Sequence, residues 1–191
     1  MGSAKVILLV ILGILIIGAI GAYSLVKGTY NDLVRLDEGV NGKWAQVENQ
    51  LQRRYDLIPN LVSTVKGYAA HEKEVFVAVT EARSRVGSAG TTGEKMEANN
   101  QLAGALSRLL LVVERYPELK ANQNFIRLQD ELAGTENRIA TERMRYNDAA
   151  VGYNTKLRSF PTNVIAGFFS FERHELFQAP EAAKDVPKVE F

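Results

Sequence analysis

The side chains that most often do chemistry are scarce in this sequence. It contains no cysteine, and His71 and His174 are its two histidines, so disulfides, thiol catalysis and cysteine-ligated zinc sites are excluded. Residues 71–75, HEKEV, begin like the HExxH motif of zinc proteases, but Val75 stands where the second histidine ligand is required. We therefore expect His71 to be structural or to face solvent, and we expect no metal site.

Two motifs of phosphate and ester chemistry also fail. The loop at residues 87–95, GSAGTTGEK, resembles a phosphate-binding P-loop, but Glu94 separates Gly93 from Lys95 and no strand is predicted before it. The sequence has no G-x-S-x-G nucleophile elbow. The loop is therefore predicted to be a connector, and the sequence favours a protein that is not an enzyme and binds no cofactor.

Three Tyr–Asn pairs form the most unusual polar pattern. A buried tyrosine hydroxyl needs a partner, and asparagine can hold that hydroxyl or backbone groups. The last two tyrosines are seven residues apart and so lie on one side of a helix. We expect a polar clasp that fixes helix register; the alternative is a ligand or partner site near the membrane. The pairs are Tyr30-Asn31, Tyr146-Asn147 and Tyr153-Asn154.

Charged residues on the predicted first and last helices raise a similar choice. They either form interhelical ion pairs that select one alignment or make an anion-binding face. Thr135 and Glu142 interrupt the apolar stripe of the last helix. We therefore expect some of these charges to be partly buried, and full exposure of Glu142 and Arg143 would contradict that expectation. The set is Arg53, Arg54, Glu136, Arg138, Arg143 and Arg145.

An aromatic segment follows the last long helix. We define it as residues 160–171, which contain Phe160, Phe168, Phe169 and Phe171. Aromatic rings favour the boundary between lipid and water, so these residues are candidates for contact with the membrane or a partner. The equally weighted alternative is a short fifth helix that covers the open end of a bundle.

The chain ends in PKVEF after a polar, proline-spaced stretch, and we expect residues 173–191 to be a flexible tail. Val189 and Phe191 alternate before the terminal carboxylate, an ending that can add as a strand to a PDZ-type domain. They are candidate C-terminal recognition residues, although a chance ending is the safer interpretation.

The N-terminal region predicts a membrane anchor within residues 1–28. Residues 6–26 are apolar and span about 31 Å as a helix, which matches a hydrocarbon core of about 30 Å. A cleaved signal peptide is the rival interpretation, but its apolar region usually runs only about 7–15 residues. The anchor residues are Val6, Leu8, Leu12, Leu15, Ile20 and Val26.

Residues 29–172 show the pattern of an antiparallel up-down four-helix bundle. Apolar residues from Leu33 to Ala69 recur every 3.6 residues on average, which is the helical period. Pro59 suits the first turn of a helix, so we predict a turn at Tyr55–Asp56; one kinked helix over residues 29–86 is the alternative. The other predicted helices cover residues 56–86, 94–116 and 117–160. In this topology, residue numbers at equal height on the first and last helices add to about 188, and residues 160–171 return to the membrane.

Several blocks of the sequence resemble those of a known family. Residues 30–72, 135–154, 160–169 and the closing PKVEF are similar to the LemA family, related to the magnetosome protein MamQ. The resemblance implies a bacterial or archaeal single-pass membrane protein bearing a helical bundle, with no established enzymatic activity. Some relatives carry a lipoprotein signal instead of an anchor, which implies a bundle on the extracytoplasmic side, whereas basic residues beside the anchor lean slightly the other way.

These observations favour an all-α, non-enzymatic membrane protein. Lysine plus arginine number 23 and aspartate plus glutamate 22, so no basic field for nucleic acid exists. We expect a scaffold or organiser of membrane-associated proteins whose partners are the lipid bilayer and either its own copies or other membrane proteins. The alternative is a membrane-remodelling or membrane-lining protein that acts on lipid through its anchor and aromatic segment.

Overall fold

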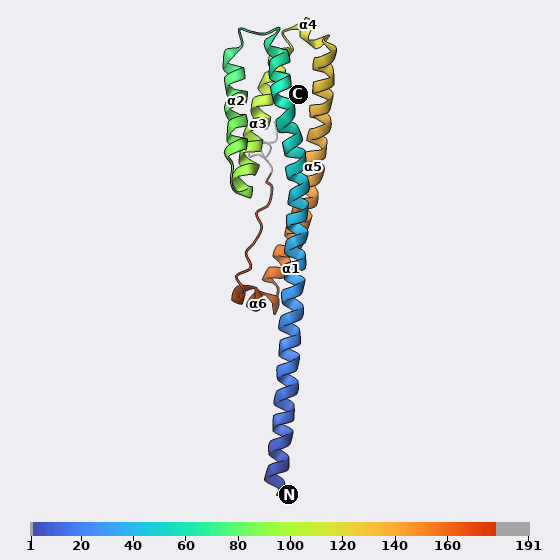
Figure 1. The fold of residues 1–191 in the computed structure, drawn as a ribbon, viewed down its shortest axis with the longest axis vertical. Helices are drawn as coiled ribbons and strands as arrows, with labels where there is room; N and C mark the ends of the chain where they lie inside the picture. Colours follow the sequence, from blue (N-terminus) through green and yellow to red (C-terminus); the bar gives the residue numbers. More distant parts are fainter. Residues whose placement is uncertain (1, 179–191) are drawn as a thin grey trace, which may run out of the picture. The chain divides into compact units, whose positions relative to one another are not determined.

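The secondary structure is entirely helical in the part of the chain that the structure describes. The structure is a computed structural model that describes residues 2–178, and Figure 1 shows its ribbon. The all-α class with an apolar N-terminal helix is confirmed. The elements are α1 (Ser3–Lys66), α2 (Lys73–Ser88), α3 (Thr92–Val113), α4 (Pro117–Lys120), α5 (Gln123–Arg158) and α6 (Thr162–Phe168).

The predicted turn at Tyr55–Asp56 is wrong. Helix α1 continues through Pro59 and ends at Lys66. The alternative of one helix through the proline is right on this point, but that helix does not extend to residue 86. The first turn of the bundle lies instead at residues 67–72, where the Tyr68 N–H donates to the carbonyl of Val65 over 3.1 Å.

Core packing explains why the helix tolerates its proline. Pro59 cannot donate to the carbonyl of Tyr55, a loss worth about 3 kcal/mol in a helix interior. The proline itself faces outward. Large apolar side chains on the opposite face are buried, and each contributes about 1.5–3 kcal/mol relative to exposure. Breaking the helix would misalign that stripe, which includes Ile58, Leu61 and Val65.

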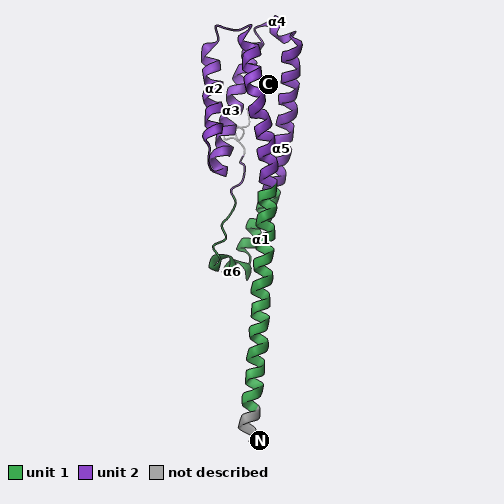
Figure 2. Ribbon diagram, in the orientation of Figure 1, with its two compact units in different colours: residues 1–42, 148–174 green, residues 43–147, 175–191 purple. Residues whose placement is uncertain are grey.

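The chain divides into two compact units, coloured separately in Figure 2. Unit 1 comprises Met1–Gly42 and Asp148–His174, and unit 2 comprises Lys43–Asn147 and Glu175–Phe191. Helices α1 and α5 therefore contribute residues to both units.

Unit 2 contains the predicted antiparallel up-down four-helix bundle. It is made of residues 43–66 of α1, then α2, α3 and residues 123–147 of α5, with α4 as a short connection (Figure 1). All four helices contribute to one apolar core. Its fully buried side chains include Leu61 and Val65 from α1, Val79 from α2, Leu102 and Leu109 from α3, and Phe125 from α5.

Side-chain caps fix several helix ends of unit 2. Thr91 and Glu94 form a capping box at the start of α3, in which the Glu94 N–H donates to the Thr91 hydroxyl over 3.2 Å. The Asn122 side chain accepts hydrogen bonds from the N–H groups of Asn124 and Phe125. Two predicted boundaries were wrong. The third helix ends at Val113 instead of residue 116, and the fourth long helix begins at Gln123 instead of residue 117.

Unit 1 pairs α1 with the end of α5 and carries α6. Leu33, Val40, Tyr153 and Leu157 are buried between these elements. The Asp32–Lys156 ion pair, at 3.1 Å, falls on the predicted sum of 188 for antiparallel helices. Within unit 2, Arg54 and Glu136 pair at 2.9 Å, two residues from that sum. The predicted antiparallel register thus agrees with these contacts to within two residues.

The apolar start of α1 is not covered by the other residues that the structure describes. The 18-residue window with the highest mean hydropathy is 0% buried, and within the described residues α1 is the one helix long and apolar enough to cross a membrane. The predicted anchor side chains Leu8, Leu12, Leu15, Ile20 and Val26 are all exposed in this helix. Val6 belongs to the same helix.

Candidate functional site

Asn154 in unit 1 holds the backbone of His174 with two hydrogen bonds. The Asn154 Nδ2 donates to the His174 carbonyl over 2.8 Å, and the His174 N–H donates to the Asn154 Oδ1 over 3.0 Å. The amide side chain thereby pairs with both backbone polar groups of one residue, as a neighbouring strand would. We call this arrangement the His174 clamp.

The imidazole of His174 has its own partners in unit 1. Its Nε2 lies 2.7 Å from Asp37 Oδ1, and the Tyr153 ring packs edge-on against it with centroids 5.1 Å apart. Burial, and secondarily the Asp37 carboxylate, raise the pKa of Tyr153 to about 12. The Tyr153 hydroxyl therefore stays protonated well above neutral pH, and the Tyr153 ring packs against the imidazole of His174.

Asn147 repeats the construction in unit 2. Its Nδ2 donates to the Phe177 carbonyl over 3.1 Å, and the Phe177 N–H donates to its Oδ1 over 3.0 Å. The adjacent Tyr146 hydroxyl donates to the Glu175 carbonyl over 2.8 Å. Burial, and secondarily Glu175, raise the pKa of Tyr146. We call this the Phe177 clamp.

An aromatic cluster surrounds the Phe177 ring. The ring centroid lies 5.8 Å from that of Trp44 and 5.6 Å from that of Tyr146. The Arg143 guanidinium carbon lies 4.6 Å from the ring centroid, a cation–π distance. The Phe177 ring thus packs against two aromatic rings and a guanidinium, while its backbone is held by Asn147.

The two clamps give two of the three Tyr–Asn pairs a common structural role. Each asparagine holds a backbone segment after α6 rather than the facing helix. The third pair differs: Asn31 is exposed, and Tyr30 packs against the aromatic segment with its ring 4.8 Å from Phe169 and 5.6 Å from Phe171. The three pairs therefore do not form one site.

The aromatic segment presents a buried face and an exposed face in unit 1. Ile165 and Ala166 are buried in α6, whereas Phe160 is 83% exposed and Phe168 is 82% exposed. Tyr30, which Phe169 contacts, lies four residues after Val26 and so about 6 Å farther along α1. The exposed ring of Phe168 packs against Phe169, with centroids 5.1 Å apart, and so lies near the end of the apolar stretch. Helix α6 is a short additional helix, as the alternative interpretation expected, but it belongs to unit 1 and not to the bundle of unit 2.

The partly buried charges expected on α1 and α5 are present in unit 2. Arg54 is 4% exposed, and burial lowers the pKa of its guanidinium while Glu136 opposes that shift. Burial likewise lowers the pKa of Arg143, and the Glu136 carboxylate opposes that shift. The Glu142 side chain is 16% exposed and accepts a 2.6 Å hydrogen bond from Arg145. Arg53 forms an exposed pair with Glu131 at 3.8 Å, and Arg138 is exposed.

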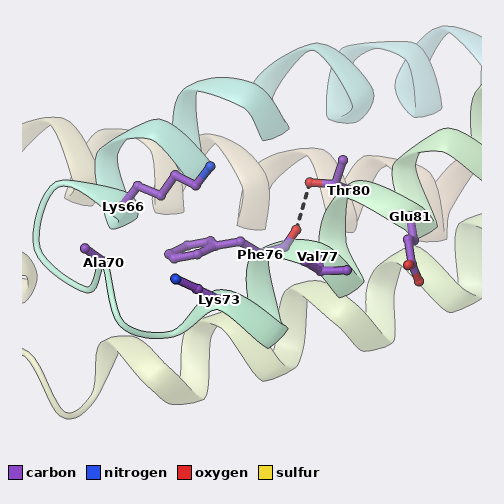
Figure 3. A pocket seen from close by; sticks show the side chains of 7 residues that line it. All are labelled: Lys66, Ala70, Lys73, Phe76, Val77, Thr80 and Glu81. Carbon is purple, nitrogen blue, oxygen red and sulfur yellow. Dashed lines mark hydrogen bonds between the residues drawn. The ribbon is translucent and has the colours of Figure 1, made fainter.

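A separate surface pocket of about 450 Å³ lies where α1 ends and α2 begins. Figure 3 shows the ammonium groups of Lys66 and Lys73 flanking the Phe76 ring, and the Lys66 Nζ lies 5.6 Å from the ring centroid. The Thr80 hydroxyl donates to the Phe76 carbonyl over 2.8 Å. The contacts around this pocket are a hydrogen bond within α2 and a cation–π contact between α1 and α2. They stabilise the two helices and indicate no ligand, so we assign the pocket no role.

Sequence reasoning missed the partners of the clamps. Nothing in their spacing connected Asp37 with His174, or Trp44 with Phe177, because these contacts depend on where the chain passes after α6. His71 is exposed as expected. Among residues 2–178, no group of three or more histidine, aspartate or glutamate side chains is arranged to hold a metal. The candidate recognition residues Val189 and Phe191 lie outside the described residues.

Comparison with known proteins identifies the family. The sequence profile of the LemA family matches residues 43–191. The chain belongs to the LemA family. It is 30% identical to magnetosome protein MamQ 2 of Paramagnetospirillum magneticum over 99% of this chain and 78% of that protein. It is 25% identical to Protein LemA of Metamycoplasma hominis over 83% of this chain and 73% of that protein. Each of these LemA-family similarities includes most of the helical domain.

Proposed function

We propose that this LemA-family chain is a membrane-anchored, non-enzymatic organiser of membrane-associated proteins. Residues 1–28 serve as the anchor, residues 29–172 form the helical domain, and the aromatic segment rests on the bilayer surface. The observation that carries the proposal is the exposure of Phe168, whose ring lies 5.1 Å from that of Phe169. Phe169 in turn packs against Tyr30, about one helical turn beyond the apolar stretch. Similarity to the MamQ proteins over 99% of this chain supports a joint role for anchor and bundle.

The chemistry of the aromatic segment suits a lipid surface. Aromatic rings favour the headgroup level, and removing a phenylalanine side chain from water contributes about 1.5–3 kcal/mol. Arg158 precedes the segment, Lys156 is paired with Asp32 at 3.1 Å, and residues 149–171 contain no acidic side chain. Because basic residues near a membrane are attracted to anionic lipids, charge and apolar contact act in the same direction.

A tryptophan placed at Phe168 tests the contact. In full-length protein with Trp44→Phe as background, Phe168→Trp in vesicles should be quenched by lipids brominated near the headgroup. The matched control is Leu111→Trp, which replaces another exposed apolar residue (70% exposed) on α3 of unit 2. Equal quenching at the two positions, or none at Phe168, would contradict the proposal.

A membrane-remodelling role is the second candidate, and the same exposed rings favour it. The two roles give different outcomes with the purified full-length protein. An organiser should form a cross-linked adduct of defined mass, with its own copies or another membrane protein, and leave vesicle shape unchanged. A remodeller should change vesicle shape in electron micrographs without any partner protein.

We further propose that the bundle lies on the extracytoplasmic side of a bacterial or archaeal cell membrane. Since the chain contains no cysteine, a single cysteine at the exposed Ser88 reports its location directly. A membrane-impermeant maleimide should label Ser88→Cys in intact cells. Labelling only after the membrane is broken would place the bundle in the cytoplasm.

A further inference from the structure

Unit 2 contains a groove with apolar walls and an ion pair. Its volume is about 330 Å³, and it is lined by residues of α1, α3 and α5. Its apolar lining residues include Leu61, Leu106, Leu110 and Leu132, while Arg54 and Glu136 supply the charges. The volume lies at the lower end of the range typical of small-molecule sites, about 300–1,000 Å³.

Arg54 is the unusual group in this groove. It is 4% exposed, and its Nη1 lies 2.9 Å from Glu136 Oε2. That contact is close but not aligned as a hydrogen bond, and Nη1 has no hydrogen-bond partner among residues 2–178. Buried polar groups in folded proteins nearly always have such partners. Arg54 also lines the groove, so an acceptor bound there would lie beside an arginine that lacks a full set of partners.

The charge around Arg54 leaves room for one more anion. Glu136 interacts with both Arg54 and Arg143, and the two arginines repel each other. Two cations therefore share one carboxylate. The other polar side chains that line the groove, Ser107 and Gln129, carry no charge. A second carboxylate would balance the cluster, and arginine binds carboxylates through two parallel N–H groups.

We propose that this groove binds a single-chain fatty acid of about ten carbons. Its carboxylate accepts hydrogen bonds from Arg54, and its chain lies along the leucines of α3 and α5. The groove volume of about 330 Å³ corresponds to roughly eleven units of the 30 Å³ that a water molecule occupies in the liquid, and a methylene group is of similar size.

An acyl chain fits the walls better than a peptide does. Each peptide unit brings an N–H and a carbonyl that need partners when they are buried. The groove offers only one hydroxyl and one amide side chain beyond its ion pair, from Ser107 and Gln129. A hydrocarbon chain needs no such partner. Ligand chemistry therefore favours an apolar monocarboxylate.

The test uses full-length protein in lipid nanodiscs and decanoate labelled with ¹³C at its carboxyl group. Saturable binding, above that of nanodiscs without protein, should appear as a separate carboxyl resonance. Decanol, which has the same chain and no charge, should bind at least tenfold more weakly in competition. No saturable signal, or equal binding of decanol, would overturn the proposal.

Two substitutions separate binding from folding. Arg54→Gln should weaken decanoate at least tenfold, and Ala133→Phe should do so by filling the groove while keeping Arg54. The matched control is Ala140→Phe, the same change at an exposed position seven residues later on α5, which should bind decanoate as the unaltered protein does. Circular dichroism establishes that each variant is folded.

Two further outcomes would overturn the assignment. If Ala133→Phe folds and binds decanoate as tightly as Ala140→Phe does, the ligand lies elsewhere. If the tripeptide Val-Glu-Phe displaces decanoate from the unaltered protein at tenfold lower concentration, the groove is a peptide carboxylate site instead of a fatty-acid site.

Discussion

Removing the Asn154 side chain is the sharpest test of the His174 clamp. In Asn154→Ala, the His174 N–H and carbonyl both lose their partner, since these bonds run over 3.0 and 2.8 Å to one side chain. Each such hydrogen bond contributes about 1 kcal/mol net. The backbone around His174 should therefore be destabilised by about 2 kcal/mol, which is roughly a 30-fold increase in its opening equilibrium.

Amide hydrogen exchange reads this opening directly, because the His174 N–H is itself the donor to Asn154. The His174 amide should exchange roughly 30-fold faster in Asn154→Ala. The remaining contacts of His174, its ring with Asp37 at 2.7 Å and with Tyr153, should keep the segment docked for most of the time. Global unfolding by urea should change much less than the local exchange does.

Two matched variants make the result specific. Asn31→Ala removes the asparagine of the third Tyr–Asn pair, which is exposed, and should leave the His174 amide unchanged. Asn147→Ala should accelerate exchange of the Phe177 amide, whose partner it removes. If the His174 amide exchanges equally in Asn154→Ala and the unaltered protein, the clamp does not protect that backbone and the reasoning fails.

Two further predictions concern α1 and the Tyr153 hydroxyl. Pro59→Ala restores a donor for the Tyr55 carbonyl inside α1, so the free energy of unfolding should rise by up to about 3 kcal/mol; a loss of stability in urea denaturation would instead indicate a helix start at this point. The pKa of Tyr153 is raised to about 12 in the folded protein, against about 10 unfolded. Above pH 10 the unfolded state therefore binds fewer protons, and stability should fall between pH 10 and 12. Tyr153→Phe should show a shallower fall of the urea midpoint over that range, and an unchanged slope would refute the assigned shift.

The sequence predicted the fold better than it predicted the first turn. Helical periodicity depends only on which residues face the core. Most residues of the predicted stripe are indeed buried, namely Leu33, Val40, Val47, Leu51, Ile58 and Val65. Pro59 misled the prediction because local proline chemistry and tertiary burial oppose each other here. The outcome depends on the packing of Ile58 and Leu61 against other helices, which no local rule measures.

The sequence indicated only one side of each clamp, the neighbouring tyrosine and asparagine of α5. Asparagine beside tyrosine indicates a demand for hydrogen bonds, and the seven-residue spacing placed two pairs on one side of α5. Their partners are backbone groups of His174 and Phe177. Any residue except proline offers those groups, so nothing in the types at these positions could mark them as partners.

Asparagine has a particular advantage at these positions. A backbone segment without regular structure exposes donors and acceptors, and a neutral amide is the side chain that can satisfy one of each. The α6 helix has seven residues, Thr162–Phe168, which is too short to be stable alone. Its placement in unit 1 therefore depends on contacts at both ends, with Tyr30 packing against Phe169 and Asn154 holding His174. If the aromatic segment meets lipid as proposed, Asn154→Ala should also weaken the quenching of Phe168→Trp by brominated lipid. Unchanged quenching would mean that α6 is positioned without the clamp, by Ile165 and Ala166 alone.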